Sequence, residues 1–152
     1  MSLTAVLSRL DSDLPQALER LFALIRIPSI STDSAYAKDV AACAGALKVD
    51  FDSLGFETTI HPTAGHPVVV AHRRKPGAPH VLFYGHYDVQ PVDPENLWTH
   101  PPFSPSLAEI APGRKAILGR GSADDKGQVM TFIEACRAYL AETGDLPVGV
   151  TL

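Results

Sequence analysis

The chain has 152 residues, of which 45% are hydrophobic and 20% charged, and its 13 basic and 17 acidic side chains give a formal net charge of −4. This is the composition of an ordinary globular domain, and it shows no basic stripe of the kind that nucleic-acid binding requires. No apolar run approaches the roughly 20 residues needed to cross a bilayer, and the first residues lack the pattern of a secretory signal. We therefore expect a cytoplasmic protein with no membrane and no nucleic-acid partner. Cys43 and Cys136 fall in helical patterns and are expected to be buried, reduced thiols.

Three segments carry apolar residues at three- and four-residue steps, which predicts helices over residues 14–26, 34–54 and 126–141. Asp13 is the expected N-cap of the first helix, with Pro15 in its first turn. Gly55 is expected to be the residue that ends the second helix in a left-handed conformation, and Gly144 closes the third.

Short β-type runs lie at residues 56–61, 67–72, 80–84, 115–118 and 148–152. Near-continuous apolar strands separated by helices predict an α/β fold with a central mixed, mostly parallel sheet that helices flank on both faces. The prolines of the stretch 92–112 forbid regular structure over most of its length and indicate a functional loop. Because the last run reads as the start of a core strand, we expect residues 1–152 to be the front part of a longer domain.

The first candidate site follows the apolar run 80–84. Gly85 permits a sharp turn there, and His86 lies just beyond the carboxyl end of an expected central strand, where open α/β sheets bind ligands. Asp88 can accept the other N–H of the imidazole, which would make His86 a better metal ligand. Taken alone, this triplet fits a structural histidine better than a ligand.

The second candidate site precedes the third helix and contains two neighbouring carboxylates, Asp124 and Asp125. Acids at a helix start are also favoured by the helix dipole in proteins of any function. Gly119-Arg120-Gly121 begins like a dinucleotide fingerprint, but Asp124 stands at the third glycine position and argues against nucleotide binding. Together the two sites supply an imidazole and carboxylates, a ligand set for catalytic zinc. A shared carboxylate would hold two ions roughly 3.5–4 Å apart.

The runs Gly85-His86-Tyr87-Asp88 and Gly119-Arg120-Gly121-Ser122-Ala123-Asp124-Asp125-Lys126-Gly127 resemble the paired motifs of metallopeptidase family 20. This family of zinc-dependent exopeptidases and amidohydrolases includes acetylornithine deacetylase, succinyl-diaminopimelate desuccinylase, aminoacylase, glutamate carboxypeptidase and carnosine dipeptidase. Residues 86–91 and 122–127 are most similar to its dipeptidase-like branch. The resemblance implies a dinuclear zinc hydrolase, with cobalt or manganese as alternative metals. Such an enzyme cleaves the amide bond of a dipeptide or an N-acyl amino acid and forms a homodimer as a full-length protein.

The resemblance also assigns roles to individual residues. It implies that His86 and Asp124 are metal ligands, with Asp124 bridging the two ions. It implies that Asp88 takes part in catalysis by orienting His86. The peptide bond between Asp124 and Asp125 is expected to be cis, as in the family.

Other polar and aromatic residues near the motifs are expected to be structural. Arg120 and Lys126 hold the turn and screen the acidic cluster, while Trp98 and Phe103 pack the long loop. The histidines that match no family ligand position are expected on the surface or in loops: His61, His66, His72, His80 and His100.

The resemblance places further machinery outside residues 1–152: the rest of the catalytic domain, a glutamate general base, a second glutamate, an aspartate and a histidine as metal ligands, and an inserted domain for dimerisation and for covering the site. We therefore expect the chain alone to be inactive, because general-base catalysis contributes ~10²–10⁴-fold and two ligands hold zinc weakly. Two alternatives remain open: an N-acyl amino acid deacylase of the same family, or a non-catalytic stand-alone module with a degenerate metal half-site.

Overall fold

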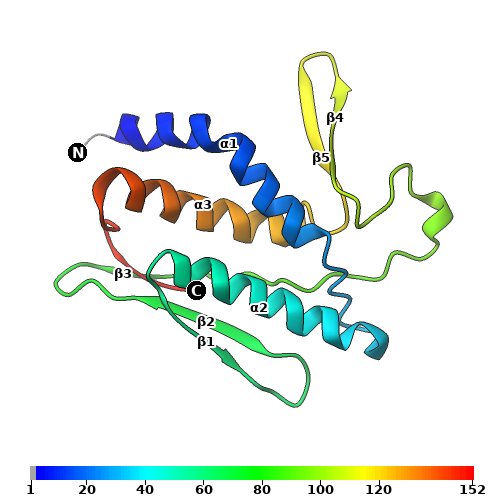
Figure 1. Cartoon of the computed structure of the whole chain (residues 1–152), viewed down its shortest axis with the longest axis horizontal. Helices are drawn as coiled ribbons and strands as arrows, with labels where there is room; N and C mark the ends of the chain where they lie inside the picture. The colour runs from blue at the N-terminus through cyan, green and yellow to red at the C-terminus, as the bar shows by residue number, and fades with distance from the viewer. Residues whose placement is uncertain (1–2) are drawn as a thin grey trace.

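The computed structural model describes residues 3–152. In chain order it contains α1 (Leu3–Ile25), the 3₁₀ turn η1 (Ser34–Tyr36), α2 (Ala37–Ser53), β1 (Glu57–His61), β2 (Val68–Arg73), β3 (His80–Leu82), the turn η2 (Glu95–Leu97), β4 (Ser106–Ala111), β5 (Arg114–Leu118), α3 (Lys126–Thr143) and β6 (Gly149–Thr151). Figure 1 shows the helices stacked above a small sheet, with the β4–β5 ribbon projecting to one side.

The main sheet has four strands in the order β1-β2-β6-β3. β2 is antiparallel to both β1 and β6, whereas β3 and β6 are parallel. The predicted α/β fold with a mixed sheet flanked by helices is confirmed, but the parallel majority is not present in this sheet. The reason is local, since β1 and β2 form a hairpin through the short loop 62–67, and a hairpin connection makes its strands antiparallel.

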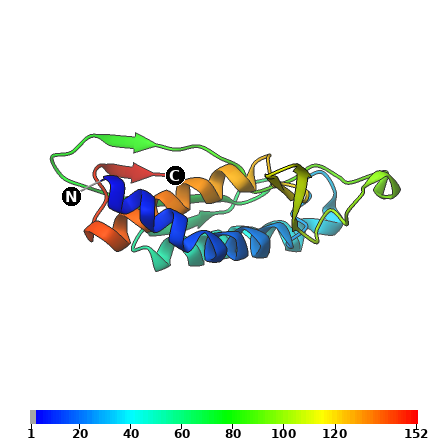
Figure 2. The same ribbon diagram turned by 90° about the horizontal axis from the view of Figure 1, so that it is seen from above.

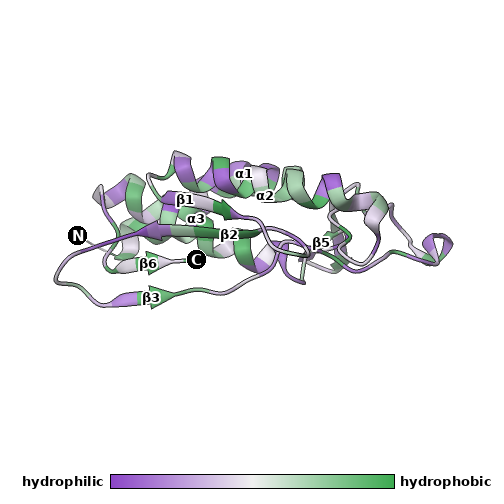
Figure 3. Cartoon of the chain, turned by 90° about the horizontal axis from the view of Figure 1, so that it is seen from below, coloured by the Kyte–Doolittle hydropathy of each residue, from purple (hydrophilic) through white to green (hydrophobic). Residues whose placement is uncertain are grey.

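The helices cover only one face of this sheet within the described residues. Seen from below, β1 and β2 cross in front of α3, and α1 and α2 lie along the β1 side of the sheet (Figure 3). The view from above places β3 on the side of the molecule away from α1 and α2 (Figure 2). Apolar side chains are exposed on the strands, with Leu82 at 73%, Val68 at 49% and Val81 at 43%. Val81 and Leu82 are consecutive and point to opposite faces, so both faces of β3 are uncovered within residues 3–152. The expectation of cover on both faces is wrong for this part of the chain, and β3 is an edge strand instead of a central one.

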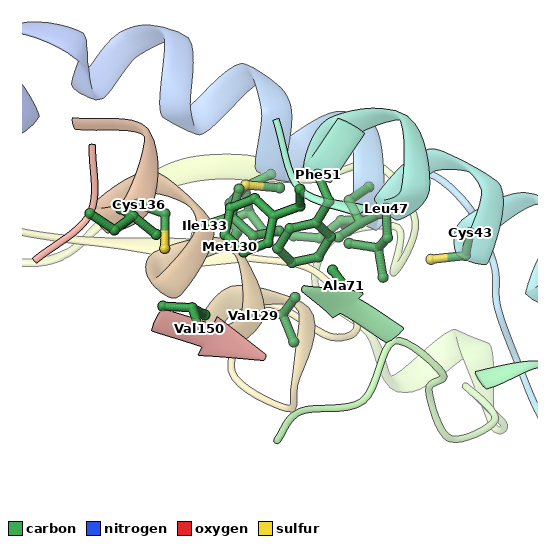
Figure 4. Close-up of a cluster of buried hydrophobic side chains, with 14 residues drawn as sticks. Cys43, Leu47, Phe51, Ala71, Val129, Met130, Ile133, Cys136 and Val150 are labelled. Carbon is green, nitrogen blue, oxygen red and sulfur yellow. The ribbon is translucent and has the colours of Figure 1, made fainter. Parts of the chain in front are cut away.

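The hydrophobic core lies between α2, α3 and the covered face of the sheet, with further side chains from the second half of α1 (Figure 4). Phe51 of α2, Ile133 of α3 and Ala71 of β2 are fully buried in it. Packing of α3 against the sheet brings the start of α3 beside the end of β3, since Val129 borders the backbone at Gly85. Both motifs predicted to carry the chemistry therefore meet at one edge of the sheet.

The ends of α2 and α3 agree with the sequence. Gly55 has a φ of 74° directly after α2, and Gly144 has a φ of 75° and closes α3 by donating its N–H to the carbonyl oxygen of Leu140. L-amino acids with a side chain rarely adopt this left-handed conformation, whereas glycine does so without a steric penalty.

The first helix differs from the prediction. α1 begins at Leu3, so Asp13 is not its N-cap but an interior residue that pairs with Arg9 at 2.7 Å one turn earlier. Pro15 therefore lies inside the helix, and α1 bends along its length (Figure 1). A proline removes one backbone hydrogen bond and kinks a helix without always ending it. The apolar side chain of Val6, which is 2% exposed, stabilises the additional turns.

The stretch rich in proline contains more regular structure than expected. Residues Ser106–Ala111 form β4, which pairs with β5 as an antiparallel ribbon separate from the main sheet. The prolines flank β4 without interrupting it, and Gly113, with a φ of 72°, makes the turn between the two strands. The prediction of an irregular segment therefore holds only up to Pro105, apart from the turn η2.

Two of the expectations from composition are testable on the structure. Among residues 3–152, no helix combines the length and the apolar character needed to cross a membrane. Cys43 and Cys136 are free and buried, as predicted.

Candidate metal centre

The loop that carries His86 is held by the segment between α1 and α2. The N–H of Val89 donates to the carbonyl oxygen of Ser29 at 2.9 Å, and Ile30 forms an isolated parallel bridge with Val89. The buried hydroxyl of Ser29 donates to the carbonyl oxygen of Tyr87 at 2.7 Å. These contacts fix the backbone on the carboxyl-terminal side of His86, although the two segments lie almost sixty residues apart in sequence.

His86 lies between two carboxylates. Its Nδ1 is 3.1 Å from Oδ1 of Asp88, and its Nε2 is 2.9 Å from Oδ1 of Asp124. The predicted contact between Asp88 and the imidazole is therefore present, and the structure also brings the two predicted metal ligands together. Burial lowers the pKa of His86, but the hydrogen bond with Asp124 and the proximity of Asp88 outweigh it, so that the pKa is raised overall.

The donor set fits a cation between His86 and Asp124. When Nδ1–H donates to Asp88, a neutral imidazole presents the lone pair of Nε2 to a carboxylate oxygen that is also an acceptor. Two acceptors at this distance repel each other unless a proton or a metal ion lies between them. The side chain of Asp124 is also 83% exposed, so its carboxylate is accessible from solvent.

The second motif forms a tight loop before α3. Gly121 has a φ of 88°, and the peptide bond between Asp124 and Asp125 is cis, as the family resemblance implied. The N–H of Arg120 donates to the carbonyl oxygen of Pro102 at 2.7 Å, which attaches this loop to the proline-rich stretch. A Cβ on Gly121 would lie 2.9 Å from Val89, so the two motif loops are packed directly against each other.

Trp98 packs the long loop, as predicted, whereas the guanidinium of Arg120 contacts this loop and, among residues 3–152, forms no ion pair with the acidic cluster. The guanidinium of Arg120 lies 4.8 Å from the centre of the Trp98 ring and donates to the carbonyl oxygen of Pro91 at 3.1 Å. The indole N–H of Trp98 donates to the carbonyl oxygen of Val92 at 2.9 Å. Both side chains thus hold the long loop together, as expected of packing residues.

Lys126 is also structural, but by a different contact from the one expected. Its fully buried Nζ donates to the carbonyl oxygens of Leu24 at 3.0 Å and Ile27 at 2.7 Å. Burial lowers the pKa of this ammonium group. The hydrogen bonds of Lys126 therefore go to the end of α1, and its main role is to join the start of α3 to the segment that supports the His86 loop.

Ser31 and Asp125 belong to the site, and sequence reasoning gave neither of them a role. The hydroxyl of Ser31 donates to Oδ2 of Asp88 at 2.5 Å, and Oδ2 of Asp125 accepts the backbone N–H of His86 at 3.0 Å. His66, expected to be a surface or loop residue, is half-buried in a loop, where its Nε2 lies 2.7 Å from the carbonyl oxygen of Ser31. Ser31 and His66 line a hollow of about 390 Å³ beside His86.

The other histidines lie away from this site. His72 on β2 and His80 on β3 share the hydroxyl of Thr151, at 2.8 and 2.7 Å, so these two are strand residues and not loop residues. His61 is exposed at the end of β1, and His100 is exposed in the proline-rich stretch. Between Leu3 and Leu152, no group of three or more His, Cys, Asp or Glu side chains is placed to hold a metal ion. Among the predicted site residues, the structure thus brings together His86, Asp88 and Asp124.

The chain is similar to a family of known proteins. The model of Peptidase family M20/M25/M40 matches residues 82–152, which include both motifs. Succinyl-diaminopimelate desuccinylase of Hahella chejuensis is 37% identical over 127 residues, covering 84% of this chain and 30% of the relative. The Cys-Gly metallodipeptidase DUG1 of Saccharomyces cerevisiae is 32% identical over 164 residues, covering 98% of this chain and 33% of the relative.

Solved structures show the same similarity in three dimensions. The dipeptidase Dug1p of Saccharomyces cerevisiae superposes with a TM-score of 0.86 at 31% identity, over 99% of this chain and 33% of that one. Human carnosine dipeptidase 1 superposes with a TM-score of 0.85 at 26% identity and the same coverage. The chain therefore spans about a third of the length of the relatives that it matches.

Proposed function

Because this chain belongs to peptidase family M20/M25/M40, we propose that the protein it forms part of is a metal-dependent hydrolase that cleaves the amide bond of a dipeptide. The observation that carries the proposal is the 2.9 Å approach of His86 Nε2 to Asp124 Oδ1. An imidazole and a carboxylate from two separate motifs meet there, with their acceptor atoms directed at the same space. This is the arrangement that a catalytic zinc site requires of its protein ligands.

In this proposal His86 and Asp124 would hold the metal, and Asp124 would contribute a ligand to both ions of a zinc pair. Bound there, such ions would lower the pKa of a water molecule and polarise the scissile carbonyl. Asp88 accepts the Nδ1–H of His86 and so keeps the Nε2 lone pair directed at the site. Asp88 is thus the catalytic-site residue that orients the ligand.

Residues 1–152 form one part of the catalytic domain in this proposal. The general base, the remaining ligands and a dimerisation domain belong to other parts of the protein, which we propose to be a homodimer. On this view residues 1–152 alone hydrolyse no substrate. The two free, buried thiols of Cys43 and Cys136 support a cytoplasmic location, because reduced cysteines persist in that compartment.

A deacylase is the second candidate. The identity of 37% to succinyl-diaminopimelate desuccinylase favours an N-acyl amino acid as substrate, whereas the Cys-Gly and carnosine dipeptidases favour a dipeptide. We prefer the dipeptide because the two dipeptidase structures align with 99% of this chain. Relative kcat/KM values for Cys-Gly, carnosine and N-succinyl amino acids distinguish the two reactions.

Elemental analysis of the full-length protein, purified without added metal, tests the proposal. About two zinc ions per polypeptide are expected, with cobalt or manganese as substitutes. His86→Ala and Asp124→Ala are each expected to lower hydrolysis by more than ~100-fold, beyond the loss caused by residues that only orient ligands. A folded full-length protein without metal or hydrolysis would instead support a non-catalytic module. Hydrolysis by residues 1–152 alone would contradict the division of the site proposed above.

A further inference from the structure

Asp125 stands at the start of α3 but does not cap it. An aspartate in the N-cap position normally accepts a hydrogen bond from a backbone N–H two or three residues later, which compensates for a donor that the helix leaves unpaired. In this structure the N-cap Asp125 makes no such side-chain bond. Its Oδ2 instead accepts the backbone N–H of His86 at 3.0 Å, 39 residues earlier in the sequence.

The surroundings of this bond leave little room for another arrangement. A Cβ on Gly85 would lie 2.9 Å from Oδ2 of Asp125 and 2.6 Å from Cγ2 of Val129. Only a residue without a side chain lets the backbone of the first motif approach α3 this closely. The carboxylate of Asp125 is half-buried at this junction, where a charged acceptor strengthens a hydrogen bond to an amide.

His86 is consequently held at two points by two successive residues. Asp124 lies against its imidazole Nε2 at 2.9 Å, and Asp125 binds its backbone N–H at 3.0 Å. The imidazole contact depends on a side chain that is 83% exposed, whereas the backbone contact is made at the packed base of the loop. The backbone contact, together with the packing of Gly121 on Val89, therefore holds the two motifs at a fixed separation.

We propose that Asp125 is a positioning residue of the metal centre, which fixes the backbone of His86 to the loop that carries Asp124. This inference rests on the proposed function, since it assigns to Asp125 the task of presetting the separation of the two metal ligands. Asp125 touches neither metal nor substrate in this role. It acts through His86, and it gives up the ordinary capping bond of α3 to do so.

Three substitutions separate this role from helix capping. Asp, Asn and Ser are all strong N-cap residues, but they differ in reach. Asp125→Asn keeps a carbonyl oxygen at the same distance along the side chain, whereas the hydroxyl of Asp125→Ser is one bond too short for His86. Asp125→Ala removes both abilities. If Asp125 acts as a helix cap, the Ser and Asn variants should both retain its function. If Asp125 positions His86, only the Asn variant should retain it.

Two measurements on the full-length protein test the inference. The first is the Kd of zinc by competition with a chromophoric chelator. We expect Asp125→Ala and Asp125→Ser to weaken zinc binding by about 10–100-fold, the range for residues that orient metal ligands, and Asp125→Asn to stay within about 3-fold of the wild type. Equal zinc affinity of the Ser and Asn variants, or an unchanged affinity of the Ala variant, would overturn the inference.

The second measurement needs neither metal nor a variant of Asp125. Selective ¹⁵N-histidine labelling reports the six histidines of this chain, and the His86 amide is identified by its loss in His86→Asn. In metal-free wild-type protein this amide should exchange with solvent at least ~10-fold more slowly than an unprotected loop amide. Exchange at the unprotected rate would refute the bond. A wild-type protein that binds no zinc would refute the proposed function alone, because the exchange rate still decides whether Asp125 holds His86.

Discussion

The hydroxyl of Ser31 lies 2.5 Å from Oδ2 of Asp88, while the other oxygen of this carboxylate faces Nδ1 of His86 at 3.1 Å. Ser31 therefore fixes the rotation of Asp88, which in turn fixes the imidazole plane. The carbonyl oxygen of Ser31 lies 2.7 Å from Nε2 of His66, within hydrogen-bonding distance. A row of polar contacts thus connects the segment after α1 with the candidate metal ligands.

Ser31→Ala is expected to weaken zinc binding by the full-length protein by about 3–10-fold, because Asp88 loses the donor that holds it. Ser31→Thr keeps the hydroxyl and is expected to bind zinc within about 2-fold of the wild type. Isothermal titration calorimetry on both variants makes the comparison. Equal Kd values for the Ala and Thr variants would show that Ser31 does not orient Asp88.

Gly85→Ala is expected to destabilise the protein by about 1–3 kcal/mol, as overpacking of a close contact does. The new methyl group would lie 2.6 Å from Val129, so α3 and the His86 loop must move apart. Gly45→Ala is the matched control, because this glycine lies inside α2 with no atom within 4 Å of the added Cβ. That substitution should stabilise the helix by about 0.5–1 kcal/mol. Urea denaturation measures both, and a loss at Gly45 as large as that at Gly85 would contradict the packing argument.

Lys126→Met is expected to lower the free energy of unfolding by about 2 kcal/mol, because it leaves the carbonyl groups of Leu24 and Ile27 without their donor. The loss is partly offset, since the variant no longer buries an ammonium group. Lys48→Met provides a control on a solvent-accessible lysine, which pairs with Asp52 and donates to the carbonyl oxygen of Thr58, and it should change stability by less than about 1 kcal/mol. Chemical denaturation monitored by circular dichroism tests both variants, and similar effects would argue against a special role for the buried lysine.

Stability should fall as the pH rises from 9 to 11, in part through Cys136. Burial raises the pKa of this thiol from 9.0 to about 11. In this window the unfolded thiol ionises while the folded thiol keeps its proton, so the unfolded state is favoured by at most about 1.4 kcal/mol per pH unit. The variant Cys136→Ala should therefore show a shallower decline between pH 8 and pH 10.5 in urea titrations. A decline as steep as that of the wild type would show that Cys136 does not contribute.

Periodicity predicted the elements that local sequence controls. α2 and α3 end at Gly55 and Gly144 because glycine alone tolerates the left-handed turn there without strain. α1 was predicted too short, since the Asp13-x-Pro15 pattern is typical of a helix start, but tertiary packing of Val6 favours a longer helix. β4 was missed because the neighbouring prolines hid a short strand that only pairing with β5 stabilises.

The site was predictable to the same extent. The contact of Asp88 with His86 follows from their spacing of two residues. The family resemblance, and not the spacing, predicted that Asp124 belongs to the same site as His86. Ser31 and Asp125 had no such signal. Ser31 lies 57 residues from its partner, and an aspartate at a helix start is explained equally well by capping. The exposure of β3 was not predictable from its apolar sequence either. An apolar run indicates that a strand is buried, but it does not show which helix or strand covers it.

The contact between Lys126 and the end of α1 has a consequence for the order of folding. It joins residues 102 and 99 positions apart, and the bonds of Ser31 and Asp125 span 57 and 39 positions. Contacts between distant residues form slowly, because a long loop must close before they stabilise anything. During synthesis the His86 loop therefore leaves the ribosome before either the start of α3 or its lysine is available. His86 and Asp124 therefore reach their final geometry only after the start of α3 has packed against the end of α1 and the segment that follows it.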